Sequence, residues 1–365
     1  MQPVLETMLL ILFIIFAFIA TGAIVLRQPK FGSKPSGERL AQVKQSPNYK
    51  GGAFHNQSYT PDLTEGASFY SVLKEFLFKR NKRIKPADEI PSTKTDLHLL
   101  HKDENVLVWF GHSSYFMQVD GKRILVDPVF SGHASPFAFT TRAFRGTDRY
   151  TASDIPDIDY LFISHDHWDH LDHDTIITLQ PKIKKIICSL GTGAHFERWG
   201  YDKNIIIEKD WYQQILLEDG FTAYTVPARH FSGRGIKRNQ AMWTSYALKT
   251  PTMNIFIGGD SGYDQHFAEA GKTYGPFDLA ILENGQYDKS WKYIHMTPAE
   301  VLQAAKDLRA KRVLPVHSSK FALGNHAWDT PLKTLTELNE KENIPLLTPM
   351  IGQQVNLKDT SQQFK

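Results

Sequence analysis

A short segment of the chain concentrates three histidines and one aspartate in an H-x-H-x-D-H pattern. They directly follow a run of apolar side chains and are His165, His167, Asp169 and His170. Imidazole and carboxylate groups are good zinc ligands, whereas each needs a polar partner when it is simply buried. On an extended segment, alternate residues point to one side, so His170 is directed away from the other three. The pattern therefore predicts that one segment supplies ligands to two metal ions about 3.5 to 4 Å apart.

Two metal ions need more ligands than this segment offers, and three further candidates follow strand-like apolar runs. They are His230, Asp260 and His317. Taken singly, each reads as an ordinary hydrogen-bonded histidine or a turn aspartate beside glycine. Their shared placement at strand ends favours metal ligands instead. It also disfavours the alternative that the first cluster is only a solvated, histidine-rich loop.

These features resemble the metallo-β-lactamase superfamily, and within it the branch of the N-acyl-phosphatidylethanolamine-hydrolysing phospholipases D. The ligand pattern carries the resemblance to the superfamily. The branch is indicated by Gly111-His112-Ser113-Ser114, Leu125 to Phe130, Gly275 to Ala280, Tyr293 to Glu300 and His317 to Leu323. The resemblance covers residues 46–345, and it implies an α/β fold, an αββα sandwich with a dinuclear site at one edge.

The resemblance also implies a role for each ligand. It places one Zn²⁺ on His165, His167 and His230, a second on Asp169, His170 and His317, and Asp260 as a bridge between them. Zinc lowers the pKa of bound water to about 7, which supplies a hydroxide nucleophile near neutral pH.

Together with Asp169 and Asp260, His295 completes the catalytic set that the resemblance implies. Beside the metals, His295 would bind a phosphate oxygen or protonate the leaving group. The alternative is that His295 only precedes a helix beginning near Thr297. Asp127 is expected to orient a metal ligand, or else simply to form a turn with Pro128.

The expected function is that of a membrane-associated phosphodiesterase of phospholipase D type, acting on N-acyl-phosphatidylethanolamine-like lipids. The alternative is a zinc-dependent lactonase or carboxyl-ester hydrolase, since the same nucleophile can attack carbon. The net charge of +3 is too small to indicate nucleic acid as a partner. With 365 residues and 41% hydrophobic content the chain can form one large catalytic domain. Cys188 is the only cysteine, which excludes an intrachain disulfide, and a homodimer is left open.

The first 27 residues are expected to form a transmembrane anchor or an uncleaved signal. Met8 to Leu26 carry no charge and, as a helix, would span about 28 Å, close to the thickness of the bilayer's hydrocarbon core. The absence of Lys and Arg before this stretch, and the presence of Glu6, favour a retained anchor over a cleaved signal. The basic residues that follow favour a cytoplasmic enzyme, but a periplasmic one is left open.

Residues 28–100 are expected to form a tether and an N-terminal extension, followed by the catalytic domain at 101–365. The stretch from Gln28 to Tyr59 has no helical period and is rich in turn-forming residues. After it, apolar residues recur at helical spacing from Phe69 to Leu77, and five basic residues follow between Lys79 and Lys85. Such an amphipathic helix can lie on an anionic lipid surface. The alternative is a helix packed on the domain with a solvated basic end.

The remaining patterns predict strands and helices in alternation. Strands are expected at 106–109, 115–119, 123–126 and 160–163, and near Ile186, Ile205, Ile215, Ala223, Tyr246, Ile255, Leu279 and Val313. Helices are expected near 174–179, 195–199, 264–270, 298–308 and 332–341.

Overall fold

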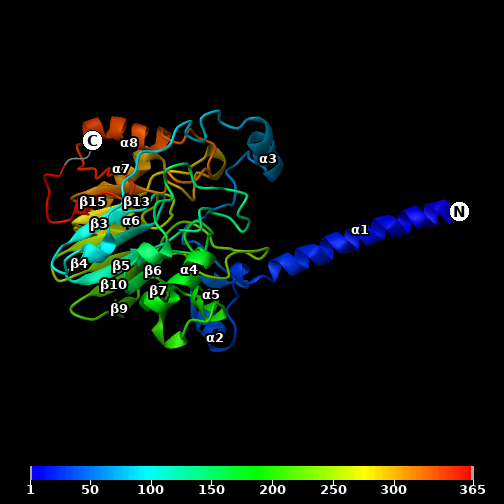
Figure 1. The fold of residues 1–365 in the computed structure, drawn as a ribbon, viewed down its shortest axis with the longest axis horizontal. Coiled ribbons are helices and arrows are strands. Elements are labelled where there is room, and N and C mark those ends of the chain that lie inside the picture. The colour runs from blue at the N-terminus through cyan, green and yellow to red at the C-terminus, as the bar shows by residue number, and fades with distance from the viewer. Residues whose placement is uncertain (1, 363–365) are drawn as a thin grey trace.

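Two β sheets packed face to face form the centre of the protein (Figure 1), as seen in a computed structural model that describes residues 2–362. One sheet has seven strands in the order β15-β3-β4-β5-β6-β7-β8, and the other has six in the order β14-β13-β12-β11-β10-β9. The strands of the first sheet are β3 Val106–Trp109, β4 Tyr115–Val119, β5 Lys122–Val126, β6 Ile158–Ile163, β7 Ile183–Ser189, β8 Ile206–Lys209 and β15 Gln354–Asn356. Those of the second are β9 Gln214–Leu216, β10 Thr222–Val226, β11 Ser245–Lys249, β12 Asn254–Ile257, β13 Leu279–Glu283 and β14 Val313–Val316.

Five of the helices, α4 to α8, cover the outer faces of the two sheets. The helices are α1 Gln2–Leu26, α2 Gly37–Gln45, α3 Phe69–Phe78, α4 His173–Leu179, α5 Gly193–Arg198, α6 His266–Thr273, α7 Pro298–Asp307 and α8 Thr330–Glu342. Short 3-10 helices occur at Pro29–Phe31, Leu97–Leu99, Ala152–Asp154, Gln180–Lys182, Lys203–Ile205 and Lys289–Trp291. Helices α4 and α5 pack on the seven-stranded sheet through side chains such as Ile176 and Phe196. Helices α6, α7 and α8 pack on the six-stranded sheet through side chains such as Phe267, Val301 and Leu335.

The largest apolar core lies between the sheets, because alternate residues of each strand point inward. Tyr160 and Phe162 of β6, for example, face this core, while Leu161 and Ile163 face the helices. Strands β5 to β7 have apolar residues on both faces and pair in parallel, as expected of strands covered on both sides. The expected αββα order of layers is therefore confirmed.

Strand direction brings the loops that carry the chemistry to one edge of each sheet. In the seven-stranded sheet, β3 and β5 both run antiparallel to β4, and β6 runs parallel to β5. In the other sheet, β10 and β12 both run antiparallel to β11, and β13 and β14 continue in parallel. The carboxyl ends of β3, β5 and β6 thus share an edge, as do those of β10, β12, β13 and β14.

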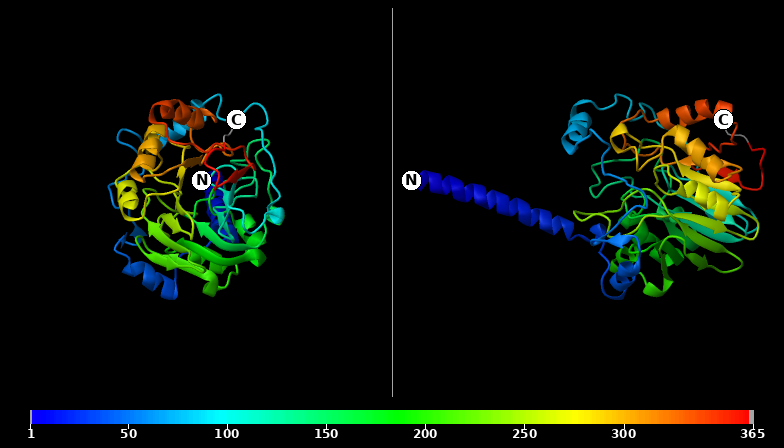
Figure 2. Two further views of the ribbon diagram at one scale, coloured as in Figure 1. Left: turned by 90° about the vertical axis from the view of Figure 1, so that its left-hand side faces the viewer. Right: turned by 180° about the vertical axis from the view of Figure 1, so that it is seen from behind.

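Helix α1 projects from the domain (Figure 2). The most apolar 18-residue window of Pro3–Leu26 has a mean hydropathy of 3.0 and no buried residue. Among residues 2–362, α1 is the helix long and apolar enough to cross a membrane. It fits an N-terminal anchor or a signal sequence, and it lies within the 27 residues predicted to form one.

The segment after α1 is more ordered than the expected tether. It contains α2 and a two-stranded sheet, β1 Tyr49–Lys50 and β2 Ala53–Phe54, and it buries Val43 and Phe54 completely. These two side chains pack with Trp211 and Trp243 of the domain. Val43 is the one buried residue of α2. A helix with a single buried residue shows no apolar period in its sequence, so the pattern gave no sign of it.

Helix α3 forms where the apolar spacing predicts it, and Ser68 and Ser71 cap its amino end reciprocally. Most of its large apolar side chains are left uncovered by the domain, whereas Val72 is partly buried. Phe69, Tyr70, Leu73, Leu77 and Phe78 are each more than half exposed.

Candidate metal centre

The seven residues predicted as metal ligands lie together where the two sheets meet at one edge. The loop after β6 carries His165, His167, Asp169 and His170, and the segments after β10, β12 and β14 carry His230, Asp260 and His317. Six of the seven side chains are buried, and His167 is partly buried. Their nitrogen and oxygen atoms form overlapping groups in which all candidate ligand atoms lie within 4.8 Å of one another. The geometry fits a binuclear metal site.

One group consists of His165, His167 and His230. The Nδ1 atom of His167 is 2.9 Å from Nε2 of His165 and 3.2 Å from Nε2 of His230. Two nitrogen ligands of a tetrahedral zinc ion, each about 2.0 to 2.1 Å from the metal, are about 3.3 Å apart. Three imidazoles held this closely therefore match the donor spacing of a metal site.

A second group contains Asp169, His170 and His317. The Nε2 atom of His170 is 3.5 Å from Oδ2 of Asp169 and 3.2 Å from Oδ2 of Asp260. The same Asp260 oxygen is 3.9 Å from Nε2 of His165, and the other Asp260 oxygen is 3.0 Å from Nδ1 of His317. Asp260 thus lies between the two groups.

Unpartnered polar atoms supply a test of whether these residues suit a metal. Nε2 of His170 and Oδ1 of Asp260 are fully buried and lie 3.2 and 3.0 Å from neighbouring candidate ligand atoms, yet neither makes a hydrogen bond of good geometry among the described residues. A buried polar atom without a partner is destabilising by about 1 to 3 kcal/mol. A cation between these atoms would satisfy both, so the donor set fits a pair of metal ions.

Hydrogen bonds on the far side of the rings orient the imidazoles. Asp127, directly after β5, accepts a hydrogen bond from Nδ1 of His170 at 2.8 Å, which is the contact expected of an orienting carboxylate. Nδ1 of His230 donates to the carbonyl oxygen of Ile294 at 2.9 Å. Both bonds place the proton on Nδ1, so Nε2 is left free to bind a metal.

Sequence reasoning assigned no role to two further residues of the site. His112, in the loop after β3, is completely buried and lies 2.8 Å from Oδ2 of Asp169 through its Nε2. Its ring lies 4.1 Å from that of His317. Glu283 ends β13 and is completely buried. The signal for His112 was the Gly-His-Ser-Ser motif, whereas Glu283 carries no local pattern.

His295 lies beside the metal-binding groups. Its Nδ1 is 2.6 Å from Oε2 of Glu283, and its ring is 5.0 Å from that of His230 and 5.2 Å from that of His317. The other Glu283 oxygen accepts backbone N–H groups of Ser261 and Met296. His295 does precede helix α7, as the alternative states, but Glu283 also directs its ring toward the site.

Burial determines most of the protonation states. It lowers the pKa of His165, His230 and His317 well below the usual value, and that of His167 to about 4. These imidazoles are therefore neutral, which is the form that binds metals. For His170, the carboxylates of Asp260 and Asp169 outweigh burial and raise the pKa. Burial raises the pKa of Asp260 to about 6.

The backbone at the site adopts an unfavourable conformation at several positions. His112, Asp127 and His317 have φ angles of 52°, 41° and 65°, in the left-handed region that non-glycine residues rarely adopt. Each stands just after a strand, where the chain must turn sharply to direct a side chain inward. Such strain is typical of functional sites.

The metal centre opens into a cavity of about 570 Å³. His167, Asp169, His230, Asp260 and His317 line one end of it, and His295 lines the same cavity. Most of the other lining side chains are apolar: Leu63, Phe69, Val72, Ala134, Trp168, Phe231, Trp291, Ile294 and Leu323. A two-sheet fold with a histidine- and aspartate-rich centre at a strand edge defines a metal-dependent hydrolase.

Comparison with known proteins agrees with this class. A family model described as a beta-lactamase superfamily domain matches residues 122–318. An uncharacterized protein of Mycobacterium tuberculosis is 34% identical over 348 residues, which cover 93% of each chain. The chain belongs to the metallo-β-lactamase superfamily.

Two further similarities concern a named enzyme and a solved structure. N-acyl-phosphatidylethanolamine-hydrolyzing phospholipase D 1 of Caenorhabditis elegans is 31% identical over 234 residues, covering 59% of this chain and 64% of the relative. The structure of Igni18, a metallo hydrolase from Ignicoccus hospitalis, matches with a TM-score of 0.53 at 20% identity, covering 69% of this chain and 98% of its own. At this identity the second similarity shows the fold alone.

Proposed function

We propose that the chain is a zinc-dependent phosphodiesterase of phospholipase D type that cleaves N-acyl-phosphatidylethanolamine-like phospholipids at a membrane surface. The observation that carries the proposal is that the metal-binding residues line a cavity whose remaining lining residues are mainly apolar. A phospholipid has the same division, since its charged phosphate lies next to long apolar chains. Such a cavity suits an amphipathic substrate better than a small polar one.

The opening of the cavity supports a lipid substrate. Phe69 and Val72 of α3 line the cavity, while Leu73 and Leu77 of the same helix are more than half exposed. The basic residues from Lys79 to Lys85 follow directly. A helix with an exposed apolar face and a basic end binds anionic lipid surfaces. Substrate could then pass from the bilayer along α3 to the metal centre.

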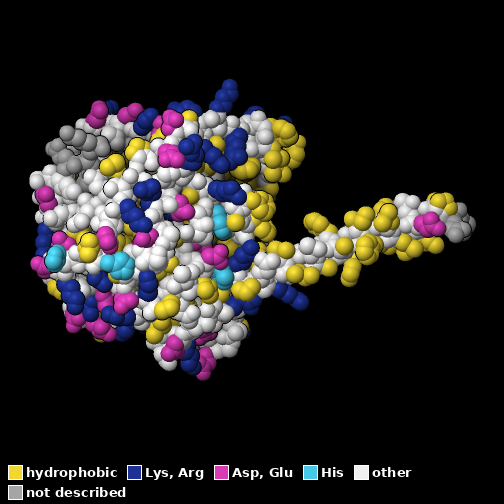
Figure 3. All heavy atoms as spheres, in the orientation of Figure 1, with side chains coloured by type: hydrophobic (Ala, Val, Ile, Leu, Met, Phe, Trp, Pro, Cys, Tyr) yellow, Lys and Arg dark blue, Asp and Glu magenta, His cyan; other side chains and the backbone are white. Residues whose placement is uncertain are grey.

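Helix α1 and helix α3 lie on the same side of the domain (Figure 3). Hydrophobic side chains gather over α3 on the face from which α1 projects. If α1 is a retained anchor, it holds this face, and with it the cavity, next to the bilayer.

The donor set supports zinc as the metal, because imidazole nitrogen and carboxylate oxygen are its usual ligands besides thiolate. When bound, a pair of zinc ions supplies a hydroxide nucleophile near neutral pH and neutralises charge that develops on the phosphate. Among the chain's own side chains, His295 is the one we expect to act on the phosphate group or on the leaving alcohol. Because Glu283 accepts from Nδ1, Nε2 of His295 remains for a phosphate oxygen or for proton transfer to the leaving alcohol.

Similarity to a named enzyme adds independent support. The Caenorhabditis elegans relative carries the name of an N-acyl-phosphatidylethanolamine-hydrolysing phospholipase D, and so does a mitochondrial protein of Saccharomyces cerevisiae that is 31% identical over 247 residues.

The proposal is tested with the full chain purified in detergent and assayed on three substrates: N-acyl-phosphatidylethanolamine, phosphatidylcholine and a homoserine lactone. We expect phosphatidate to be released from the N-acylated lipid, with loss of activity on chelation and recovery on addition of zinc. Hydrolysis of the lactone alone would replace the phosphodiesterase with a lactonase.

A further inference from the structure

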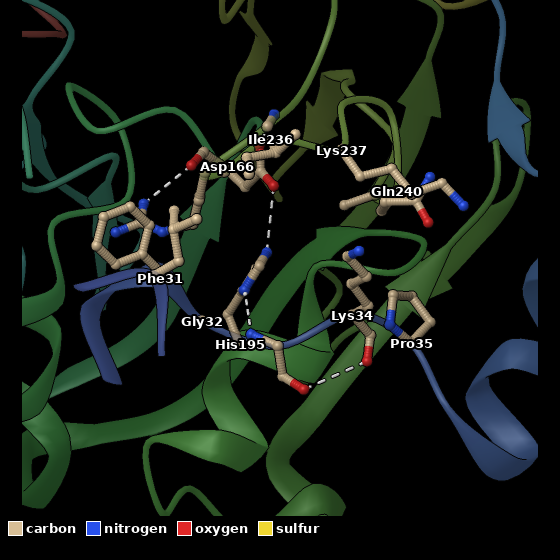
Figure 4. Close-up of a pocket in the computed structure, with 15 residues that line it drawn as sticks. Phe31, Gly32, Lys34, Pro35, Asp166, His195, Ile236, Lys237 and Gln240 are labelled. Atoms are coloured by element: carbon tan, nitrogen blue, oxygen red, sulfur yellow. Dashed lines mark hydrogen bonds and ion pairs between the residues drawn. The ribbon is translucent and has the colours of Figure 1, made fainter. Parts of the chain in front are cut away.

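A second cavity of about 340 Å³ lies at the foot of helix α1, apart from the one that opens onto the metal centre (Figure 4). Leu26, the last residue of α1, lines it, as do Phe31 and Lys34 of the following segment. Asp166 and His195 line another part of it, and residues 233–237 complete it. None of its lining residues lines the cavity at the metal centre.

Two lysines at this cavity have no charged partner. Lys34 and Lys237 are both exposed, and neither has a carboxylate within ion-pair distance in the part of the chain from residue 2 to 362. Figure 4 shows the Lys34 side chain reaching into the space between His195 and Gln240. Flexible ammonium groups beside a cavity are suited to an anion with several oxygen atoms.

A third cation lies in the wall of the cavity. Arg234 is almost completely buried and donates only to backbone carbonyl oxygens, those of Lys30, Asp166 and Leu171. Its guanidinium lies 4.0 Å from the ring centroid of Trp168. A buried charge without an ion pair is destabilising, so an anion nearby is favourable. Asp166 is the acidic residue in the lining, and it already accepts from Gly233 N–H and lies 3.2 Å from His195 Nε2.

Apolar side chains share the cavity with these cations. Leu26 and Phe31 line it next to the membrane-spanning candidate, and Ile236 is 86% exposed. The cavity thus lies where α1 would leave the bilayer, at the level of lipid head groups. At that depth a phospholipid offers both an anionic group and apolar chains.

We propose that this cavity binds the phosphate group of an anionic phospholipid, with Lys34, Lys237 and Arg234 facing the phosphate and Leu26 and Ile236 next to the acyl chains. The site is distinct from the substrate cavity. The proposal takes α1 to be a retained anchor, and the binding it describes does not depend on which bond the metal centre cleaves.

Hydrogen bonds link the cavity to the metal-binding loop. The backbone N–H of Ser33 donates to Nδ1 of His195 at 3.1 Å, and Nε2 of His195 lies 3.2 Å from Asp166, which stands between His165 and His167. Arg234 joins the same parts, since it donates to both Lys30 O and Asp166 O. A lipid in the cavity would therefore fix the foot of the anchor against the loop, and we expect anionic lipid to raise turnover.

The experiment compares the full chain in nanodiscs of phosphatidylcholine alone with the full chain in nanodiscs that also contain phosphatidylglycerol. Native mass spectrometry then counts the lipids that stay bound after detergent release. The test variant is Lys34→Ala/Lys237→Ala, and the matched control is Lys44→Ala/Lys50→Ala, which removes the same charge from exposed positions outside the cavity. Thermal unfolding checks that all three proteins are folded.

We expect the unmodified chain and the control to retain phosphatidylglycerol, and the test variant to bind it about tenfold or more weakly. Restoration by Lys34→Arg/Lys237→Arg would support a charge-based site. Equal retention by all three proteins would overturn the proposal. A calorimetric titration with inorganic phosphate distinguishes a lipid phosphate from a soluble one. Saturable binding of inorganic phosphate without any retained phosphatidylglycerol would assign the cavity to a soluble phosphate and overturn the proposed lipid site.

These readouts are independent of the proposed reaction. Failure of the phospholipase assay would leave lipid retention unchanged, whereas failure of lipid retention would remove only the activation by anionic lipid and leave the basal cleavage measured without anionic lipid unchanged.

Discussion

Replacing Asp127 with asparagine should weaken the binding of one of the two metal ions. Oδ1 of Asp127 accepts the backbone N–H of Ser164 at 2.8 Å, and Oδ2 lies 2.6 Å from Ser164 Oγ and 2.8 Å from His170 Nδ1. A carboxylate only accepts, so it fixes the proton of His170 on Nδ1 and leaves Nε2 for the metal.

Asparagine has nearly the same shape but one oxygen fewer. If its oxygen keeps the Ser164 N–H, its NH₂ group faces His170 and moves the imidazole proton to Nε2, where the metal would bind. If the amide is flipped, the NH₂ group faces the Ser164 N–H instead. Loss of such an orienting contact lowers metal affinity by about 10- to 100-fold, equivalent to about 1.4 to 2.7 kcal/mol.

The assay is a zinc titration of the metal-free protein against a chromophoric chelator, fitted with two sites. We expect the site that includes His170 to weaken by about 10- to 100-fold and the other to change by much less, because His170 bonds Asp127 directly whereas His165 reaches it only through Ser164 Oγ. The control is Asp159→Asn, which alters a carboxylate that accepts a backbone N–H at the other end of β6. Unchanged affinity at both sites in Asp127→Asn would refute this reasoning.

Three further predictions concern pH, the proton donor and the lipid surface. The pKa of Asp260 is about 6 and that of His170 is raised, so protons compete with the metal for these groups in acid. Zinc affinity should therefore fall as the pH is lowered through 6 and reach its full value well above pH 6. Zinc affinity that stays the same between acid and neutral pH in a chelator titration would contradict this prediction. The variant His295→Gln should lower kcat by about 10²- to 10⁴-fold and leave the metal content unchanged. Glu283→Gln should lower kcat by less. Loss of bound metal together with the loss of activity would show that both residues are structural. The variant Leu73→Gln/Leu77→Gln should reduce activity on lipid vesicles but not on a short-chain soluble diester. Lys74→Gln is the control for helix α3. Equal effects of the leucine variant on both substrates would exclude a role of these side chains in lipid docking.

Regular patterns in the sequence were sufficient to predict most of the fold. Strands β5 and β6 each end in an uninterrupted apolar run, and the turn signal Asp120-Gly121 separates β4 from β5. The elements missed are short or irregular. Strand β15 has three residues and is held by pairing with β3, which lies far away in the sequence. Such pairing leaves no local signal.

The metal-binding residues were recognisable because each follows an apolar run, and strand ends converge in a two-sheet fold. His112 and Glu283 also follow strands, but neither stands in a cluster. Their importance depends on partners 57 and 12 positions away, namely Asp169 and His295. Only the folded chain shows those contacts.

The cavity at the foot of α1 could not be predicted for a similar reason. Its walls come from four separated parts of the chain, represented by Lys34, Asp166, His195 and Lys237. A solvated basic residue and a cavity-lining one look alike in a sequence. Residues 29–35 pack against the domain, and Trp199 Nε1 donates to Pro29 O. This packing is what makes Lys34 a cavity-lining residue rather than a solvated one.

Anomalous X-ray scattering from crystals of the zinc-loaded protein would show directly whether two metal ions bind. We expect two zinc peaks about 3.5 to 4 Å apart, one among His165, His167 and His230 and the other among Asp169, His170 and His317, with Asp260 between them. A single peak, or none at these side chains in protein saturated with zinc, would contradict a dinuclear centre and the chemistry inferred from it.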